Sequence, residues 1–174
     1  MGNCTSKNER NLENLLKASD LSLDSVTTLV RKAEKMKRLV VQQGGDSRLA
    51  HRVLGSIFYE PSTRTSCSFT AAMMRLGGSV MPLSLETSSQ KKGEVFEDTI
   101  QTMACYCDAI VIRHPTIGHV YCAAQYSNKP IINAGEGVGE HPTQALLDVY
   151  TIFSEIHRVG NFTIINDKSI FSKS

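Results

Sequence analysis

Apolar residues recur along the chain with two different periods. The first clear pattern is helical, with apolar side chains returning every three or four residues between Ser22, a residue type that caps helices, and Gly44-Gly45, which can end one. Beyond the glycines, short apolar runs alternate with amphipathic segments. The runs predict strands over 53–59, 79–83, 109–112, 129–133 and 162–165, and the amphipathic segments predict helices over 65–76, 94–106, 118–126 and 141–159.

Strands that alternate with helices predict βαβ units. The expected fold class is therefore α/β, with a parallel β-sheet flanked by helices on both faces. Ligands of such sheets bind beyond the carboxyl ends of the strands. The polar segments that directly follow the predicted strands are thus the places where we expect a functional site.

Composition and charge exclude some classes of function but indicate none. The chain has 174 residues, of which 41% are hydrophobic and 21% charged, and its formal net charge is +2. So balanced a charge gives no reason to expect a nucleic-acid partner. The sequence has no apolar run of about 18 residues and no recognisable secretory signal, so we expect a cytoplasmic protein.

The five cysteines do not indicate a metal site or a disulfide framework. Their odd number favours reduced thiols. Cys105 and Cys107 form a C-x-C pair, but no second cluster completes a zinc site. We expect both to be packing residues, and we expect no metal site.

The polar N-terminal stretch reads as a flexible arm over residues 1–15. Its first six residues fit the acceptor pattern for N-myristoylation, with Gly2 as the acceptor and Cys4 as a neighbouring palmitoylation candidate. One acyl chain anchors a protein only marginally, so membrane binding is expected only if these residues are lipidated. The alternative is a chance match on a disordered arm.

The first post-strand segment, 60–66, carries several hydroxyls and one guanidinium at the start of a predicted helix. Backbone N–H groups at a helix N-terminus favour an anion, and Arg64 adds charged donors. This combination suits a phosphate, although the glycines and lysine of a Walker A loop are missing. The alternative is simple helix capping by Ser62 or Thr63.

Three further segments follow strands and carry candidate chemistry. A polar loop over 87–94 bears two lysines, which can reach an anion or merely be solvated. Arg113 ends another apolar run, where it can face the crevice or the surface. The glycine-rich segment 133–144 leads to His141 and Gln144 at a helix start, where the helix dipole would lower the pKa of the imidazole. A histidine that only caps the helix is the alternative.

Together these segments resemble aspartate carbamoyltransferase, over about residues 16–161. The matching motifs are Phe58–Thr65, Ser88 with Lys91–Glu94, Ile112–Pro115 and His141–Asp148. Glu60 and Thr143 favour the aspartate enzyme over its ornithine relative, in which a basic residue and a cysteine usually stand at these positions. The resemblance implies an enzyme of de novo pyrimidine synthesis that joins carbamoyl phosphate and L-aspartate to give N-carbamoyl-L-aspartate and phosphate. It implies no metal and no organic cofactor.

The resemblance also implies roles for individual residues. The phosphate would be held by four consecutive residues: Ser62, Thr63, Arg64 and Thr65. Arg113 would bridge the phosphate and the carbonyl oxygen, while His141, Gln144 and Thr65 would orient the carbamoyl group. Ser88 and Lys92 would come from a neighbouring subunit of a homotrimer. Glu60 would bridge to a second, aspartate-binding domain.

The chain departs from the family at its C-terminal end. Residues 16–160 correspond to the carbamoyl-phosphate-binding domain, and 161–174 to a truncated start of the aspartate-binding domain. Most of the L-aspartate site is therefore expected to be missing, and Glu60 is expected to have no partner in this chain. The alternative to a transferase is a truncated, non-catalytic carbamoyl-phosphate-binding or regulatory subunit.

Overall fold

The computed structural model describes residues 14–83 and 95–156. Within them, four strands form one sheet: β1 (Val53–Phe58), β2 (Ser79–Leu83), β3 (Ala109–His114) and β4 (Ile131–Glu136). Every neighbouring pair is parallel, in the order β2-β1-β3-β4. The predicted parallel sheet is confirmed, while the strand expected over 162–165 lies outside the described residues.

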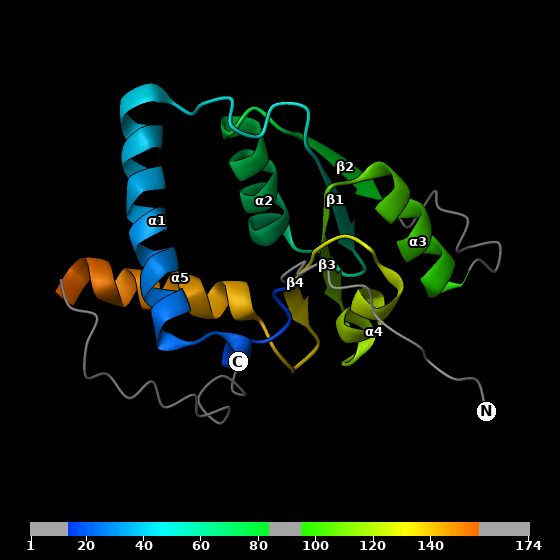
Figure 1. Ribbon diagram of the computed structural model, residues 1–174. Helices are drawn as coiled ribbons and strands as arrows, with labels where there is room; N and C mark the ends of the chain where they lie inside the picture. The colour runs from blue at the N-terminus through cyan, green and yellow to red at the C-terminus, as the bar shows by residue number, and fades with distance from the viewer. Residues whose placement is uncertain (1–13, 84–94, 157–174) are drawn as a thin grey trace.

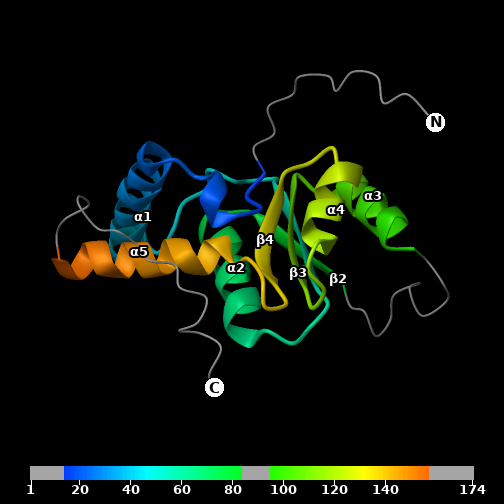
Figure 2. The same ribbon diagram turned by 90° about the horizontal axis from the view of Figure 1, so that it is seen from below.

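Among the described residues, helices cover both faces of the sheet, as predicted. Helices α1 (Leu23–Gln43), α2 (Thr63–Arg75) and α5 (Pro142–Ile156) lie on one side, and α3 (Phe96–Tyr106) and α4 (His119–Tyr126) lie on the other (Figure 1 and Figure 2). A short 3-10 helix, η1 (Ala18–Asp20), precedes α1. The α/β architecture therefore places the carboxyl ends of the strands close to the start of α2 and α5.

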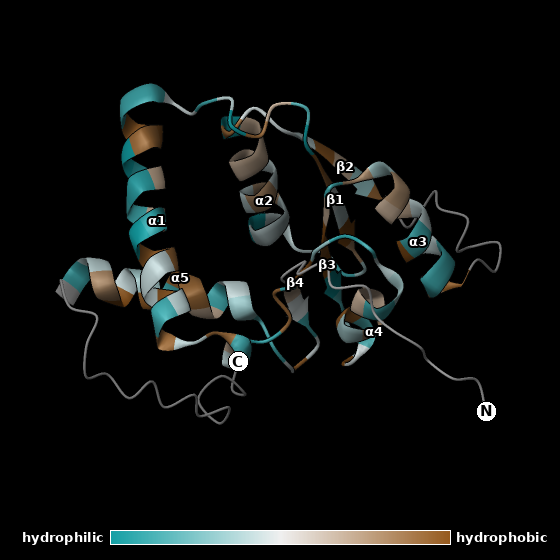
Figure 3. Ribbon diagram, viewed as in Figure 1, coloured by the Kyte–Doolittle hydropathy of each residue, from teal (hydrophilic) through white to brown (hydrophobic). Residues whose placement is uncertain are grey.

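The core is built from the central strands. Ile57, Ile110, Val111, Ile112 and Ile131 are fully buried. Strands covered on both faces read as continuous apolar runs, which is why these segments were recognisable in the sequence. Figure 3 shows the contrast between the hydrophobic β1 and β2 and the largely hydrophilic α1.

Only one of the two cysteines at the end of α3 is buried as predicted. Cys107 is buried in the core, where burial raises the pKa of its thiol, but Cys105 is exposed. Residues two apart at a helix end point in different directions, so one of the pair faces the sheet and the other faces away. The prediction that Cys105 packs in the core is wrong.

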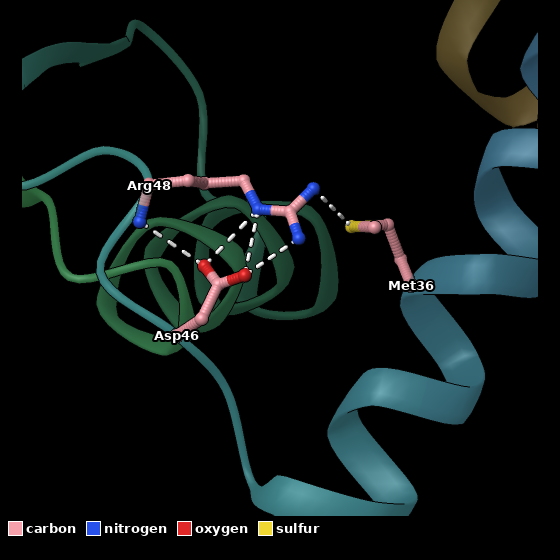
Figure 4. Close-up of polar contacts among 3 residues, drawn as sticks. All are labelled: Met36, Asp46 and Arg48. Atoms are coloured by element: carbon pink, nitrogen blue, oxygen red, sulfur yellow. Dashed lines mark hydrogen bonds and ion pairs between the residues drawn. The ribbon is translucent and has the colours of Figure 1, made fainter.

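Helix α1 has a defined cap at each end. Ser22 caps it as predicted, accepting a hydrogen bond from the Ser25 N–H at 3.1 Å, and Gly44 ends it with a φ of 78°. In the following connection, the Arg48 guanidinium holds Asp46 and also approaches the Met36 sulfur at 3.6 Å (Figure 4). This contact links the connection to the helix that precedes it.

The two edges of the sheet differ. At one edge, β2 carries Pro82, which has no N–H to offer a further strand. At the other edge, Leu15 pairs with β4: its N–H donates to the Ile131 carbonyl at 2.9 Å, and its carbonyl accepts from the Asn133 N–H at 2.9 Å. The last residues of the expected N-terminal arm therefore lie along the sheet.

Candidate functional site

A cleft of about 1150 Å³ lies among α1, α2 and α5, at the carboxyl ends of the strands. Its polar end is formed by residues that follow β1, end β3 and begin α5. It is lined there by Ser62, Thr63, Arg64, Thr65, Arg113, His141 and Gln144. The structure thus brings seven predicted site residues together, while Ser88 and Lys92 lie outside the described residues.

The start of α2 presents free backbone N–H groups to this cleft. The helix begins at Thr63, two residues earlier than predicted, so Thr63, Arg64 and Thr65 form its first turn. The first helical hydrogen bond runs from the Ser66 N–H to the Ser62 carbonyl at 3.0 Å. Ser62 occupies the capping position, but its hydroxyl caps no N–H group. The first-turn N–H groups have no partner within the helix and can donate to an anion.

Arg113 and Glu60 form an ion pair beside that turn. Arg113 Nε lies 2.6 Å from Glu60 Oε1, and Arg113 Nη1 donates to the Ala134 carbonyl at 3.2 Å. The expectation that Glu60 has no partner in this chain is therefore wrong. It fails because β1 and β3 are neighbours, so Glu60, just after β1, and Arg113, near the end of β3, meet at the same sheet edge.

Gly135 makes room for the Arg113 side chain. Its φ is 116°, and a Cβ atom there would lie 2.6 Å from Arg113 Nη1 and 3.1 Å from the His141 ring. The sequence predicted a strand ending at 133, but β4 continues through Gly135 to Glu136, with a register shift opposite Ile112 and His114. The glycine thus lies inside the strand end rather than in a loop.

The surroundings of His141 favour its neutral form. The Gln144 N–H donates to His141 Nδ1 at 3.3 Å, which assigns the ring proton to Nε2. Burial, and secondly the charge of Arg113, lower the pKa of the imidazole. The predicted direction is confirmed, and burial is the largest cause. The ring therefore both caps α5 and offers an N–H donor.

Gln144 is held from outside the cleft. Its Nε2 donates to Asp148 Oδ1 at 2.9 Å, one helical turn further along α5. Asp148 does not line the cleft. Sequence reasoning did not single out this partner, although the i, i+4 spacing of an amide and a carboxylate on a predicted helix was a readable signal.

Sequence reasoning also missed the apolar half of the cleft. Its walls come from helix faces far apart in the chain: Leu29, Val30 and Ala33 of α1, Phe69 and Ala72 of α2, and Leu146, Leu147 and Tyr150 of α5. Helix α1 is held against α5 by the Tyr150 hydroxyl, which donates to Glu34 at 2.8 Å. The hydrophobic period identified each apolar face but not the helix that it meets.

Residues 14–83 and 95–156 contain neither a metal-binding cluster nor a membrane-spanning helix. No three His, Cys, Asp or Glu side chains in these ranges are grouped so that they could hold a metal ion. None of the helices described there is long and apolar enough to cross a membrane.

Comparison with known proteins places these features in one family. A multifunctional protein pyr1-3 of Dictyostelium discoideum is 58% identical over 132 residues, covering 76% of this chain and 6% of that protein. The aspartate carbamoyltransferase catalytic subunit of Archaeoglobus fulgidus is 45% identical over 154 residues, covering 88% of this chain and 52% of the subunit. The chain thus spans about half of that subunit and a small part of the multifunctional protein.

Solved structures agree with the sequence relatives. Aspartate transcarbamoylase from Trypanosoma cruzi, in complex with carbamoyl phosphate and aspartate, superposes with a TM-score of 0.82 at 41% identity. That match covers 84% of this chain and 49% of the other. The family model of the aspartate/ornithine carbamoyltransferase, carbamoyl-P binding domain matches residues 13–154. With its cleft residues after successive strands and these matches, the chain belongs to the aspartate/ornithine carbamoyltransferase family, in its carbamoyl-phosphate-binding domain.

Proposed function

We propose that the cleft binds carbamoyl phosphate and that the chain supplies the carbamoyl-phosphate half of an aspartate carbamoyltransferase reaction. The observation that carries this proposal is the convergence of seven side chains from three strand ends on one cleft. They provide hydroxyl, guanidinium, imidazole and carboxamide groups, which match an anion joined to a carbamoyl group.

The phosphate lies at the N-terminus of α2. Ser62, Thr63, Arg64 and Thr65 surround it with hydroxyls, N–H groups and one guanidinium. The Arg113 guanidinium, which is paired with Glu60 in the structure, donates to both the phosphate and the carbonyl oxygen when the ligand is bound. The His141 Nε2–H donates to the carbonyl oxygen, and Gln144 contacts the carbamoyl NH2.

The transfer step follows from these donors. The amine of L-aspartate attacks the carbonyl carbon, and negative charge develops on the carbonyl oxygen. Thr65, Arg113 and His141 are preorganised to stabilise that charge; removing one such donor typically lowers a rate by about 10² to 10³. The C–O bond to phosphate then breaks, and the phosphate leaves with the proton released by the amine.

The whole reaction needs parts beyond the described residues. Ser88 and Lys92 would reach the cleft of a neighbouring subunit in a cytoplasmic homotrimer, and most of the L-aspartate site would lie in a second domain whose start is residues 161–174. In this proposal residues 16–160 correspond to the carbamoyl-phosphate domain, and the end of the preceding segment, at Leu15, pairs with β4. Assayed without those parts, the 174 residues are expected to bind carbamoyl phosphate weakly and to turn over poorly.

A second candidate function is a non-catalytic subunit. Such a chain would join full-length trimers and lend Ser88 and Lys92 to a neighbour. Co-purification with a full-length enzyme supports this function, and a chain that stays monomeric beside that enzyme argues against it.

Calorimetric titration with carbamoyl phosphate tests the main proposal. We expect saturable binding that Arg64→Ala weakens by at least about tenfold, because charged hydrogen bonds are lost. Arg38→Ala, on the exposed face of α1, should leave binding unchanged. An absence of binding would overturn the proposal, and near-normal formation of N-carbamoyl-L-aspartate would overturn the claim of poor turnover.

Mass spectrometry of the N-terminus checks lipidation at Gly2 and Cys4.

A further inference from the structure

Apart from its hydroxyl groups, which both donate and accept, the polar side chains of the cleft are mainly hydrogen-bond donors. Arg64 and Arg113 only donate, and His141 Nδ1 already accepts from a backbone N–H. A carbamoyl NH2 group, by contrast, requires acceptors. Among the amide, imidazole and guanidinium groups of the lining, the Gln144 Oε1 atom is the acceptor that remains.

A glutamine is an ambiguous acceptor unless something fixes its orientation. Its carboxamide carries an oxygen at one corner and an NH2 at the other, and a half turn exchanges them. With the NH2 toward the ligand, two donor groups would face each other. An exposed glutamine also keeps several rotatable bonds free, and ordering them on binding weakens affinity.

Asp148 removes this ambiguity. A carboxylate only accepts hydrogen bonds, so the Gln144 atom 2.9 Å from Asp148 Oδ1 must be the NH2 nitrogen. Asp148 lies outside the cleft and Gln144 lies in its wall. The NH2 is thus directed out of the cleft, which leaves Oε1 for a ligand.

Asp148 also acts on the neighbouring imidazole. Its charge raises the pKa of His141, against the larger lowering caused by burial and by the Arg113 charge. These are the charged groups that face the ring from β3 and from α5. One carboxylate therefore influences the two side chains that would face the carbamoyl group.

We propose that Asp148 is a positioning residue for carbamoyl recognition, holding the Gln144 carboxamide with its oxygen toward the NH2 of the ligand. The inference rests on the proposed function, since it assigns a carbamoyl ligand to the cleft. Asp148 itself contacts no ligand. Its effect is selective, because it acts on the amide end of the ligand and not on the phosphate end.

Two ligands distinguish an effect on the amide end of the ligand from an effect on its phosphate end. Phosphonoacetamide is a stable isostere of carbamoyl phosphate that retains the NH2, and inorganic phosphate lacks it. Asp148→Ala should weaken phosphonoacetamide binding by about threefold to tenfold and phosphate binding by no more than about twofold. Asp148→Asn keeps an oxygen acceptor for Gln144 and should restore phosphonoacetamide binding to within about twofold of the parent chain. Glu155→Ala removes another exposed carboxylate of α5 and serves as the control.

Nuclear magnetic resonance of the free chain provides a readout that does not depend on ligand. The side-chain NH2 signals of Gln144 should shift in Asp148→Ala far more than in Asp148→Asn, and the pKa of His141 should fall in both variants. Equal weakening of the two ligands, unchanged binding of both, or unshifted Gln144 signals would overturn the positioning role. If the parent chain binds neither ligand, the proposed function fails, while the Gln144 signals still decide the orientation.

Discussion

Arg113 and Glu60 form an ion pair beside the cleft, with Arg113 Nε 2.6 Å from Glu60 Oε1. Their side chains are 23% and 29% exposed, so the pair is only partly screened by water. The pair positions Arg113, but the Glu60 carboxylate already compensates part of the Arg113 charge. The pair makes the unliganded cleft ordered and less attractive to an anion than its composition indicates.

Removal of the Glu60 carboxylate should therefore strengthen phosphate binding. Glu60→Gln leaves the Arg113 charge uncompensated, and we expect phosphate affinity to rise by about threefold to tenfold. The free energy of unfolding should fall by about 1 kcal/mol, since a partly exposed pair contributes little. Calorimetry and urea denaturation measure the two quantities. Asp24→Asn, at an exposed position of α1, is the control, and weaker phosphate binding in Glu60→Gln would contradict the prediction.

A methyl group at Gly135 should disturb the cleft more than the fold. The φ of 116° strains any side chain there, and the added Cβ would displace the end of the Arg113 side chain. We expect Gly135→Ala to lose about 1–3 kcal/mol of stability and about tenfold in phosphate affinity. Gly118→Ala is the matched control because Gly118 has a φ of 95° and open space around it. Equal phosphate affinity in the two variants would show that Gly135 has no role in placing Arg113.

Glu136, the last residue of β4, should stabilise the start of α4. Its Oε1 accepts from the Val120 N–H at 2.6 Å, and both residues are buried. Glu136→Ala leaves that N–H without a partner, so we expect a loss of about 1–3 kcal/mol in the free energy of unfolding. Glu136→Gln retains an acceptor oxygen and should lose clearly less. Indistinguishable urea midpoints for the two variants would rule out this capping role.

Stability should decrease as the pH falls below the ordinary histidine pKa of 6.5. Burial, and secondly the charge of His119, lower the pKa of His114, whose ring stacks on the His119 ring at 3.9 Å. The unfolded chain therefore binds more protons between the folded-state pKa and 6.5, and stability is lost across that window. One such group contributes at most about 1.4 kcal/mol per pH unit. His141, whose pKa is also lowered, adds to the loss.

His119→Gln should reduce this pH dependence without abolishing it. The substitution removes one of the two causes that lower the pKa of His114, so that pKa should rise toward its ordinary value. Urea denaturation at pH 7.5 and pH 5.5, about one unit on either side of the ordinary pKa, measures the difference. Tyr121→Gln, at an exposed position of the same helix, is the control. A difference identical to that of the parent chain would contradict the coupling of the two rings.

The sequence was most informative where the chain is locally regular. Apolar runs such as the one around Ile110 predicted the parallel sheet because strands buried on both faces contain few polar residues. The end of β4 was misplaced because Asn133 interrupts the apolar pattern although it is fully buried. Its side chain donates to the Leu16 carbonyl and accepts from the Gly135 N–H, so the polar atoms are satisfied inside the strand.

Partners that are distant in the sequence could not be predicted from spacing. The seven cleft residues each follow a predicted strand, so the topology alone brought them together. Glu60 and Arg113 are separated by 53 positions, and only the adjacency of β1 and β3 shows that they meet. The Gln144–Asp148 bond is local and was readable, but its meaning depends on which side of α5 faces the cleft.

The two guarded edges of the sheet have a consequence for how the chain behaves at high concentration. An open parallel sheet with bare edges is a template on which a second copy can add strands and begin an aggregate. Pro82 interrupts the row of donors along β2, and the segment around Leu15 already occupies the backbone groups of β4. A four-stranded sheet of this kind presents little free backbone to a neighbouring molecule, which favours contact between copies through side chains rather than through continued β-pairing.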